Sequence, residues 1–119
     1  MERTSLKSRI EGFYKLPRRE RLTTLAQCAG LEDQDVTELL NPTPLPFEVA
    51  EHMIENAIGV LGLPLGVGLN FLINGRERLV PMAVEEPSVV AAASFAARIV
   101  REAGGFFAEA DPPLMIGQI

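Results

Sequence analysis

The chain has 119 residues, of which 47% are hydrophobic and 23% charged, a composition typical of one globular domain or part of one. Its formal net charge of −5 argues against a nucleic-acid partner, because nucleic acids select basic surfaces. Cys28 is the only cysteine and His52 is the only histidine, so the sequence predicts neither an internal disulfide nor a metal site of cysteine and histidine.

Three helices are predicted in the first half of the chain. The first lies between Pro17 and Gly30, because proline is favoured at the start of a helix and glycine just after its end. The second spans residues 33–40. The third covers residues 47–58, where apolar side chains recur at helical spacing, and glycines at 59 and 62 end it.

The second half of the chain predicts a β-hairpin followed by a helix. Asn74-Gly75 connects strands at residues 69–73 and 76–84, because both turn residues tolerate the positive φ of a type I′ turn. Pro81 has no amide hydrogen for a sheet and therefore marks an edge or a bulge in the second strand. The alanine-rich segment 88–103 is apolar on almost every face, which is typical of a buried helix.

The end of the sequence, residues 114–119, is apolar and predicts the start of a further strand. A strand without its continuation would leave backbone groups unpaired, so we expect the chain to be a fragment of a larger domain. Together, the predicted elements indicate an α+β fold.

Residues 57–75 carry no charged side chain and approach the length of a membrane span. This stretch contains five glycines, a proline and two asparagines, which suit a turn and a strand better than a helix in lipid. The N-terminus has no apolar segment of the kind found in signal peptides. We therefore expect no membrane partner and a cytoplasmic location.

Glu85 and Glu86 stand between an apolar strand and the alanine-rich helix. Carboxylates among residues that favour burial are candidates for an acid or a base. A solvated turn with two glutamates near a helix start is an equally weighted alternative. In an extended backbone, neighbouring side chains point to opposite sides, so only one of the two could line a cleft.

Several ordered blocks of uncommon residues follow one another along the sequence: Glu55-Asn56-Ala57-Ile58-Gly59, Pro64-Leu65-Gly66-Val67-Gly68, Asn70-Phe71-Leu72-Ile73-Asn74-Gly75, the run 79–94 with Glu85-Glu86-Pro87-Ser88, Gly104-Gly105-Phe106 and Pro113-Leu114-Met115-Ile116-Gly117-Gln118. With a weaker match over residues 5–40, they cover nearly the whole chain. These blocks resemble hydroxymethylglutaryl-coenzyme A reductase, specifically its soluble class II, which is found in bacteria and archaea and includes degradative enzymes.

The resemblance implies that residues 1–119 form the N-terminal part of the large domain, which binds substrate and coenzyme A and dimerises. The family interconverts hydroxymethylglutaryl-CoA with mevalonate and coenzyme A. Its cofactor, NAD(H) or NADP(H), would be bound by a part outside this chain, as would the C-terminal flap. A glutamate, a lysine, an aspartate and a histidine share the chemistry in the family, and only the glutamate falls here. The chain alone is therefore expected to be inactive, and the complete enzyme to be a homodimer or higher oligomer.

The resemblance also assigns site residues. Glu86 corresponds to the catalytic glutamate, and Ser88 to a residue that contacts the acyl portion of the substrate. A hydroxyl that caps the following helix is an alternative for Ser88. The dimer-interface motif corresponds to Glu55, Asn56, Ile58 and Gly59.

Near the N-terminus, the family can use an arginine to reach the phosphates of coenzyme A. Tyr14 occupies that position here, so Lys15 beside it is the candidate substitute. Lys15 also belongs to a basic cluster with Arg18, Arg19 and Arg21. We expect this cluster to be a solvated helix start, and an anion site is the less favoured alternative.

A second class of function stays open from the residues alone. The chain could be a non-catalytic α+β module for dimerisation or acyl binding that ends near Ile119. A reading frame that continues beyond Ile119 would favour the enzyme, and a stop codon there would favour the module.

Overall fold

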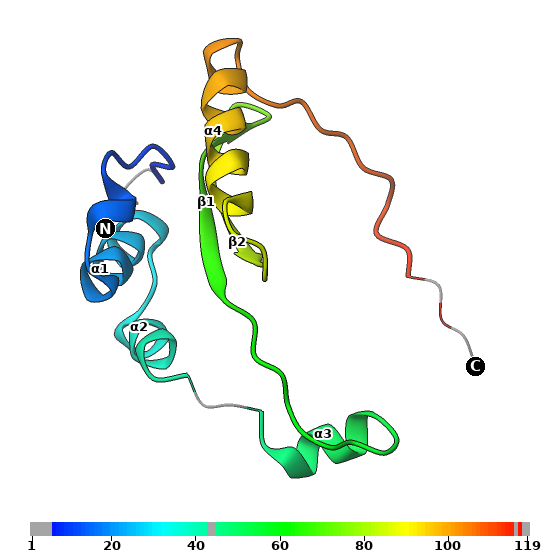
Figure 1. Cartoon of the computed structure of the whole chain (residues 1–119). Coiled ribbons are helices and arrows are strands. Elements are labelled where there is room, and N and C mark those ends of the chain that lie inside the picture. Colours follow the sequence, from blue (N-terminus) through cyan, green and yellow to red (C-terminus); the bar gives the residue numbers. More distant parts are fainter. Residues whose placement is uncertain (1–5, 43–44, 116, 118–119) are drawn as a thin grey trace.

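The computed structural model describes residues 6–42, 45–115 and 117. The fold is α+β, as predicted, and consists of helices around one antiparallel hairpin (Figure 1). In chain order the elements are the 3₁₀-helix η1 (Phe13–Lys15), helices α1 (Arg18–Ala29), α2 (Asp33–Leu40) and α3 (Phe47–Met53), strands β1 (Leu65–Ile73) and β2 (Arg76–Ala83), and helix α4 (Val89–Glu102).

The first two helices lie where the sequence predicts them. Helix α1 ends at Gly30, whose φ of 70° and backbone bond to the Ala26 carbonyl complete a left-handed C-cap. Helix α2 begins with a capping box, in which the Glu32 and Asp35 side chains each accept a bond from the other's backbone amide. Local chemistry at the helix ends therefore determines both boundaries.

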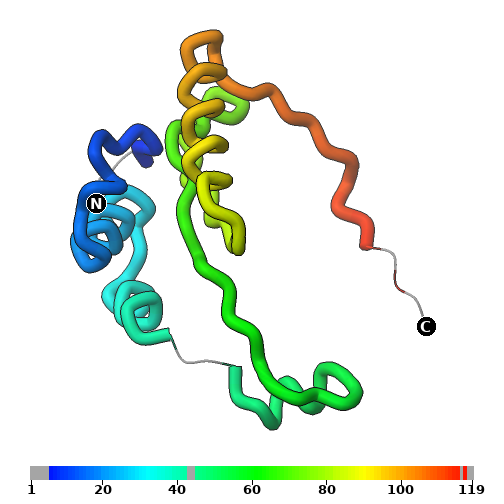
Figure 2. The backbone as a smooth tube through the Cα atoms, viewed as in Figure 1, coloured from blue at the N-terminus to red at the C-terminus, as the bar shows by residue number. Residues whose placement is uncertain are grey.

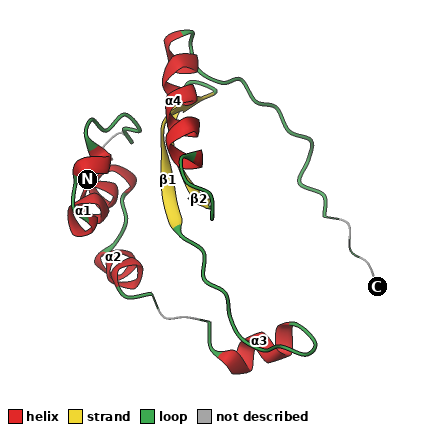
Figure 3. Cartoon of the chain, in the orientation of Figure 1, coloured by secondary structure: helices red, strands yellow, loops and turns green. Residues whose placement is uncertain are grey.

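Helix α3 is shorter than predicted. It ends at Met53 and the backbone of Ile54 is already extended, whereas the sequence predicted a helix through residue 58. Ile58 is fully exposed and Ile54 is 59% exposed, so the second half of the predicted apolar face is left uncovered by the described residues. A helix this short depends on such packing, which explains the early end. Figure 3 shows the long loop that joins α3 to β1.

The hairpin has the predicted turn. Asn74 and Gly75 have φ values of 48° and 71°, as a type I′ turn requires. Strand β1 begins at Leu65, four residues before the predicted start. Pro81 lies in β2 and pairs with Val67 of β1. Strand β2 has no second neighbour among the described residues, so the predicted edge position of Pro81 is confirmed. The bulge lies in β1 instead, between Gly68 and Phe71.

Helix α4 packs along β1 through small side chains and polar bonds (Figure 1). The Ser94 hydroxyl accepts a bond of 3.0 Å from the Leu69 amide, and the Asn70 side-chain amide donates to the Ser94 carbonyl at 3.0 Å. At Gly66 an added Cβ would lie only 3.2 Å from the Val90 side chain, so the absence of a side chain here allows α4 to approach β1 closely. The bulge of β1 is thereby fastened to the helix.

Only one face of α4 is covered, so the predicted burial of the alanine-rich helix holds on that face alone. Ala97 is completely buried against the hairpin, whereas Phe95 and Ile99 are 55% and 56% exposed. The remaining faces are largely uncovered: the Phe95 ring meets the Arg98 guanidinium of the same helix, 5.1 Å from its centre, and Ile99 is more than half exposed.

After α4 the chain returns to the hairpin and then leaves it. Phe106 forms a parallel bridge with Ile73, and the Asn74 side chain makes two bonds with the backbone of Ala108, at 2.8 and 2.9 Å. Figure 2 shows the following residues running away from the hairpin. Leu114 and Met115 are exposed and form no strand, which contradicts the predicted strand there. Residues 116, 118 and 119 of that prediction lie outside the described residues.

The molecule is much more open than a compact domain. Its radius of gyration is 17.5 Å, whereas a compact chain of this length has about 13.5 Å. Its accessible surface is 10163 Å², against about 6300 Å² expected for a compact protein of this mass. The elements therefore form one side of a core and leave a large apolar surface uncovered.

The return of the chain to the hairpin predicts a sharp difference between two adjacent glycines. Both have positive φ, 104° for Gly104 and 90° for Gly105. A Cβ at Gly105 would collide with the Leu72 carbonyl oxygen, while nothing lies within 4 Å of one at Gly104. Gly105→Ala should therefore lower the free energy of unfolding by at least about 1 kcal/mol more than Gly104→Ala, measured by urea unfolding. Equal effects would contradict the proposed collision.

Candidate functional site

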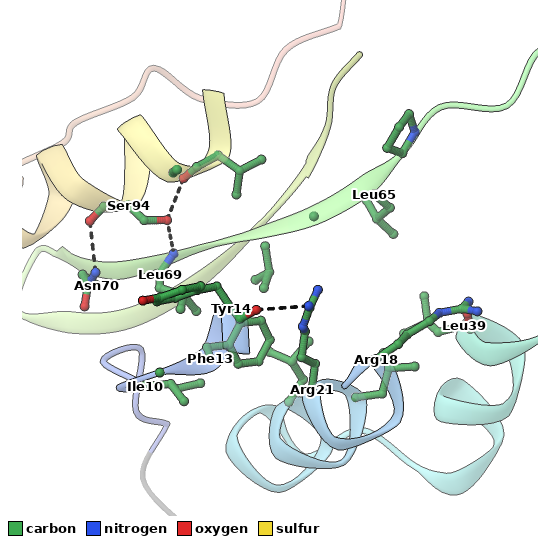
Figure 4. Close-up of a pocket in the computed structure, with 18 of the residues that line it drawn as sticks. Ile10, Phe13, Tyr14, Arg18, Arg21, Leu39, Leu65, Leu69, Asn70 and Ser94 are labelled. Atoms are coloured by element: carbon green, nitrogen blue, oxygen red, sulfur yellow. Dashed lines mark hydrogen bonds between the residues drawn. The ribbon is translucent and has the colours of Figure 1, made fainter. Parts of the chain in front are cut away.

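A groove of about 1110 Å³ separates the N-terminal part of the chain from the β1–α4 pair (Figure 4). Residues 9–14 and helix α1 line one side of it, and β1 and α4 line the other. Val90 and Ala91, in the first turn of α4, belong to the lining. The groove therefore reaches the helix start that follows Glu86 and Ser88.

The groove has a basic lining in an acidic chain. Four arginines line it, Arg9, Arg18, Arg21 and Arg98, against the two carboxylates of Glu11 and Glu38. The net charge of the whole chain is −5. A concave surface with this local excess of positive charge attracts anions.

Two of these arginines are held by backbone carbonyls. Arg21 donates from Nε to the Leu16 oxygen at 2.7 Å and from a terminal nitrogen to the Tyr14 oxygen at 3.2 Å. Arg18 donates to the Leu39 oxygen and so joins α1 to α2. Each guanidinium keeps further N–H groups beyond those bonds, because arginine carries five donors. The sequence analysis offered an anion site or a solvated helix start for this cluster, and the structure places Arg18 and Arg21 in the groove.

Tyr14 lies in the groove wall and Lys15 does not. The Tyr14 side chain is 76% exposed, and the Lys15 ammonium group lies 5.6 Å from the centre of its ring, within the range of a cation–π interaction. Lys15, the candidate substitute for the family's arginine, thus lies just outside the groove lining, beside the Tyr14 that occupies the arginine's position.

Glu86 and Ser88 both lie at the start of α4 and are exposed. Glu85 and Glu86 occupy a bend after β2, not an extended segment, so the argument that they point to opposite sides does not apply. Ser88 precedes α4 with a φ of 70°, and its hydroxyl makes no cap bond. The capping alternative for Ser88 is therefore wrong, and its side chain is available for another partner.

The predicted interface residues lie apart from this region. Glu55 and Asn56 form a turn after α3, in which Asn56 has a φ of 55°. Ile58 is fully exposed, and open space surrounds Gly59. Glu86 and Ser88 are near each other because only one residue separates them in the sequence, neither belongs to the groove lining, and the interface segment lies elsewhere.

One cluster that no sequence pattern predicted links distant parts of the chain. Glu77 on β2 pairs with Arg101 in the last turn of α4, and the Arg101 guanidinium makes two bonds to the carboxylate. The Ser8 amide donates to the same carboxylate at 2.9 Å, and the Ser8 hydroxyl contacts it. Ser8 and Glu77 are separated by 69 positions, so no local pattern could have indicated this contact.

The pair changes the titration of both groups. The hydrogen bond from Arg101 lowers the pKa of Glu77 from its ordinary 4.5 to about 2, with further help from the Ser8 bonds and against the opposing effect of burial. The same bond raises the pKa of Arg101. Both side chains are partly buried, with 24% and 22% of their surface exposed.

Within residues 6–42 and 45–115, no cluster of three or more histidine, cysteine, aspartate or glutamate side chains is arranged to hold a metal ion. No helix in the described part of the chain combines the length and the apolar character needed to cross a bilayer.

Comparisons with known proteins identify the family. The sequence model described as hydroxymethylglutaryl-coenzyme A reductase matches residues 17–119. The 3-hydroxy-3-methylglutaryl-coenzyme A reductase of Archaeoglobus fulgidus is 56% identical over 117 residues, which are 98% of this chain and 27% of that protein. An Aspergillus fumigatus protein, 3-hydroxy-3-methylglutaryl-coenzyme A reductase 2, is 32% identical over 88% of this chain and 10% of its own length.

A solved structure agrees with the sequence matches. The class II 3-hydroxy-3-methylglutaryl-CoA reductase of Streptococcus pneumoniae, bound to NADPH, has a TM-score of 0.74 and 40% identity, covering 82% of this chain and 26% of that one. These matches are all to oxidoreductases. The chain belongs to the hydroxymethylglutaryl-coenzyme A reductase family, as its sequence blocks predicted. It spans about a quarter of the length of the archaeal and streptococcal relatives and a tenth of the fungal one.

The Glu77–Arg101 pair predicts an acid-sensitive fold. Because the folded pKa of Glu77 is about 2 and its ordinary value is 4.5, the stabilisation is complete above pH 4.5 and is lost as the pH falls from 4.5 towards 2. Its size should be about 2 kcal/mol, typical of hydrogen bonds to charged groups. Between pH 4.5 and 2, urea unfolding should show a smaller decline in the free energy of unfolding for Glu77→Gln than for the unmodified chain. The exposed Glu102→Gln is the matched control and should keep the decline of the unmodified chain.

Proposed function

We propose that this chain is the N-terminal part of a class II hydroxymethylglutaryl-CoA reductase, which interconverts hydroxymethylglutaryl-CoA with mevalonate and coenzyme A. Residues 1–119 would belong to its large domain. The observation that carries the proposal is the match to the archaeal reductase along nearly the whole chain. No observation favours the alternative of a non-catalytic dimerisation or acyl-binding module.

The groove supports a coenzyme A ligand. Coenzyme A carries several phosphate charges, and the four arginines give the groove an excess of positive charge. The apolar residues of β1 and α4 offer contacts for the uncharged part of the ligand. In this proposal the phosphates lie along the arginine wall, and Lys15 adds a contact at the rim.

In this proposal the chemistry takes place near the start of α4. The reaction reduces a thioester to an alcohol in two hydride transfers, and it needs protons for the developing oxyanion and the leaving thiolate. Glu86 would hold such a proton, and the uncapped hydroxyl of Ser88 would bond to the acyl portion of the substrate. An acid that works at neutral pH needs a carboxyl removed from water, whereas Glu86 is exposed here. Parts of the enzyme beyond this chain would therefore have to cover it.

The nicotinamide, as NAD(H) or NADP(H), supplies the hydride and would be bound outside this chain. The NADPH in the Streptococcus pneumoniae structure supports a nicotinamide cofactor in general.

The exposed segment Glu55–Gly59 would form the interface of a homodimer or higher oligomer, because its apolar residue Ile58 is uncovered here. We place the enzyme in the cytoplasm.

The isolated chain should show no reductase activity. The catalytic lysine, aspartate and histidine expected from the family resemblance, together with the nicotinamide site, have no counterpart in these residues. Purified chain incubated with hydroxymethylglutaryl-CoA and either reduced cofactor should leave the cofactor absorbance unchanged against a blank. Reproducible turnover would contradict the proposal that the active site needs further segments.

In the complete enzyme, Glu86→Gln should lower kcat by about 10²–10⁴-fold with little change in KM. The amide keeps the size and the hydrogen-bonding ability of the side chain but cannot deliver a proton. The loss therefore falls on the transition state, and steady-state kinetics of the purified variant measure it.

Glu85→Gln is the matched control, since it makes the same change one residue earlier in the same exposed bend. It should leave kcat within a few-fold of the unmodified enzyme. Should Glu85→Gln prove the more damaging variant, the assignment of the catalytic role to Glu86 would be wrong.

A further inference from the structure

We propose that Glu77 is a positioning residue for substrate binding. Through Ser8 and Arg101 it holds the N-terminal wall of the groove, residues 9–14, at a fixed distance from β1. This inference rests on the proposed function, because it takes the groove as the place where part of the coenzyme A substrate binds.

Ser8 is the point at which the N-terminal part is attached to the rest of the molecule. Its side chain and backbone are completely buried. Every hydrogen bond that joins described residues before position 43 to the hairpin or α4 involves this serine. The Ser8 carbonyl accepts from the Asn70 amide at 2.9 Å, and the Ser8 hydroxyl lies 3.0 Å from the Phe71 carbonyl oxygen.

Glu77 and Arg101 make this attachment firm. The Glu77 carboxylate accepts from both the amide and the hydroxyl of Ser8, and it is held in turn by the Arg101 guanidinium. Bonds to a charged group are stronger than those between neutral groups. Without the carboxylate charge, the buried Ser8 amide has at most a neutral acceptor and the Arg101 side chain loses its ion pair, so the anchor of the wall would weaken.

The attachment and the groove meet at Asn70. Its amide bonds to Ser8, its carbonyl oxygen lies 3.5 Å from the Arg101 guanidinium, and its side chain lines the groove (Figure 4). From Ser8 the chain runs directly into the wall that contains Tyr14, and Arg21 holds the far end of that wall through the Tyr14 carbonyl. The wall is thus fixed at two ends, and Glu77 controls one of them.

The test compares Glu77→Gln with Glu102→Gln in the complete enzyme. Glu102 is an exposed carboxylate next to Arg101 on α4 and makes no bond to Ser8. For Glu77→Gln we expect KM for hydroxymethylglutaryl-CoA to rise about 10-fold, with kcat and KM for the nicotinamide changed less than about two-fold. Glu102→Gln should match the unmodified enzyme. Ser8→Ala keeps the backbone bond to Glu77 and should give an intermediate rise in KM.

A second measurement is independent of turnover. Amide hydrogen exchange at Asn70, whose N–H bonds to Ser8, should become faster in Glu77→Gln, while exchange in the β1–β2 ladder stays slow. If Glu77→Gln fails to fold, Glu77→Asp and Ser8→Ala serve the same comparison.

An unchanged KM for hydroxymethylglutaryl-CoA would overturn the positioning role. This includes a variant in which only the apparent kcat falls, because unfolding removes active enzyme without changing KM. Unchanged exchange at Asn70 would overturn it as well. If the unmodified enzyme did not turn over hydroxymethylglutaryl-CoA, the proposed function itself would fail. The exchange measurement would then still decide whether Glu77 holds the wall.

Discussion

The partly buried pair between Glu77 and Arg101 joins three parts of the chain that are far apart in sequence: the N-terminal segment, the hairpin and the end of α4. Charges removed from water are stable only when paired and fully hydrogen-bonded, and here the Ser8 amide completes the set of donors around the carboxylate. The position of the groove wall follows from this arrangement, because residues 9–14 continue directly from Ser8. The geometry of the candidate site thus depends on a cluster that lies outside it.

The rest of the molecule is an open scaffold. Its surface far exceeds that of a compact protein, and apolar side chains on α4 and in the segment after α3 are uncovered. Burial of such surface is the main source of stability, so these residues are suited to contacts with further segments or subunits. The same openness explains why Glu86 stands in water here. A proton donor needs a drier environment, which this part of the chain does not provide by itself.

Predictions from the sequence held where local chemistry decides the backbone. The turn at Asn74-Gly75 and the end of α1 at Gly30 were predicted correctly, because both need φ values that few residues adopt. Predictions that relied on burial failed. Helix α3 ends five residues early, and most faces of α4 are exposed, because the apolar pattern shows what a segment could bury but not whether a partner is within reach.

The sequence by itself determined the family, the α+β class, the hairpin and the candidate residues Glu86 and Ser88, since these depend on residue identity and on neighbours along the chain. Only the tertiary structure decided that Arg18 and Arg21 line a groove with Tyr14, that Lys15 lies at its rim, and that Ser8 meets Glu77. The contact between Ser8 and Glu77 joins residues 69 positions apart, and the groove lies between the N-terminal part of the chain and the β1–α4 pair. Their geometry is fixed when the chain closes on itself, and that closure follows from the combined packing of β1, β2 and α4 and from no single stretch of sequence.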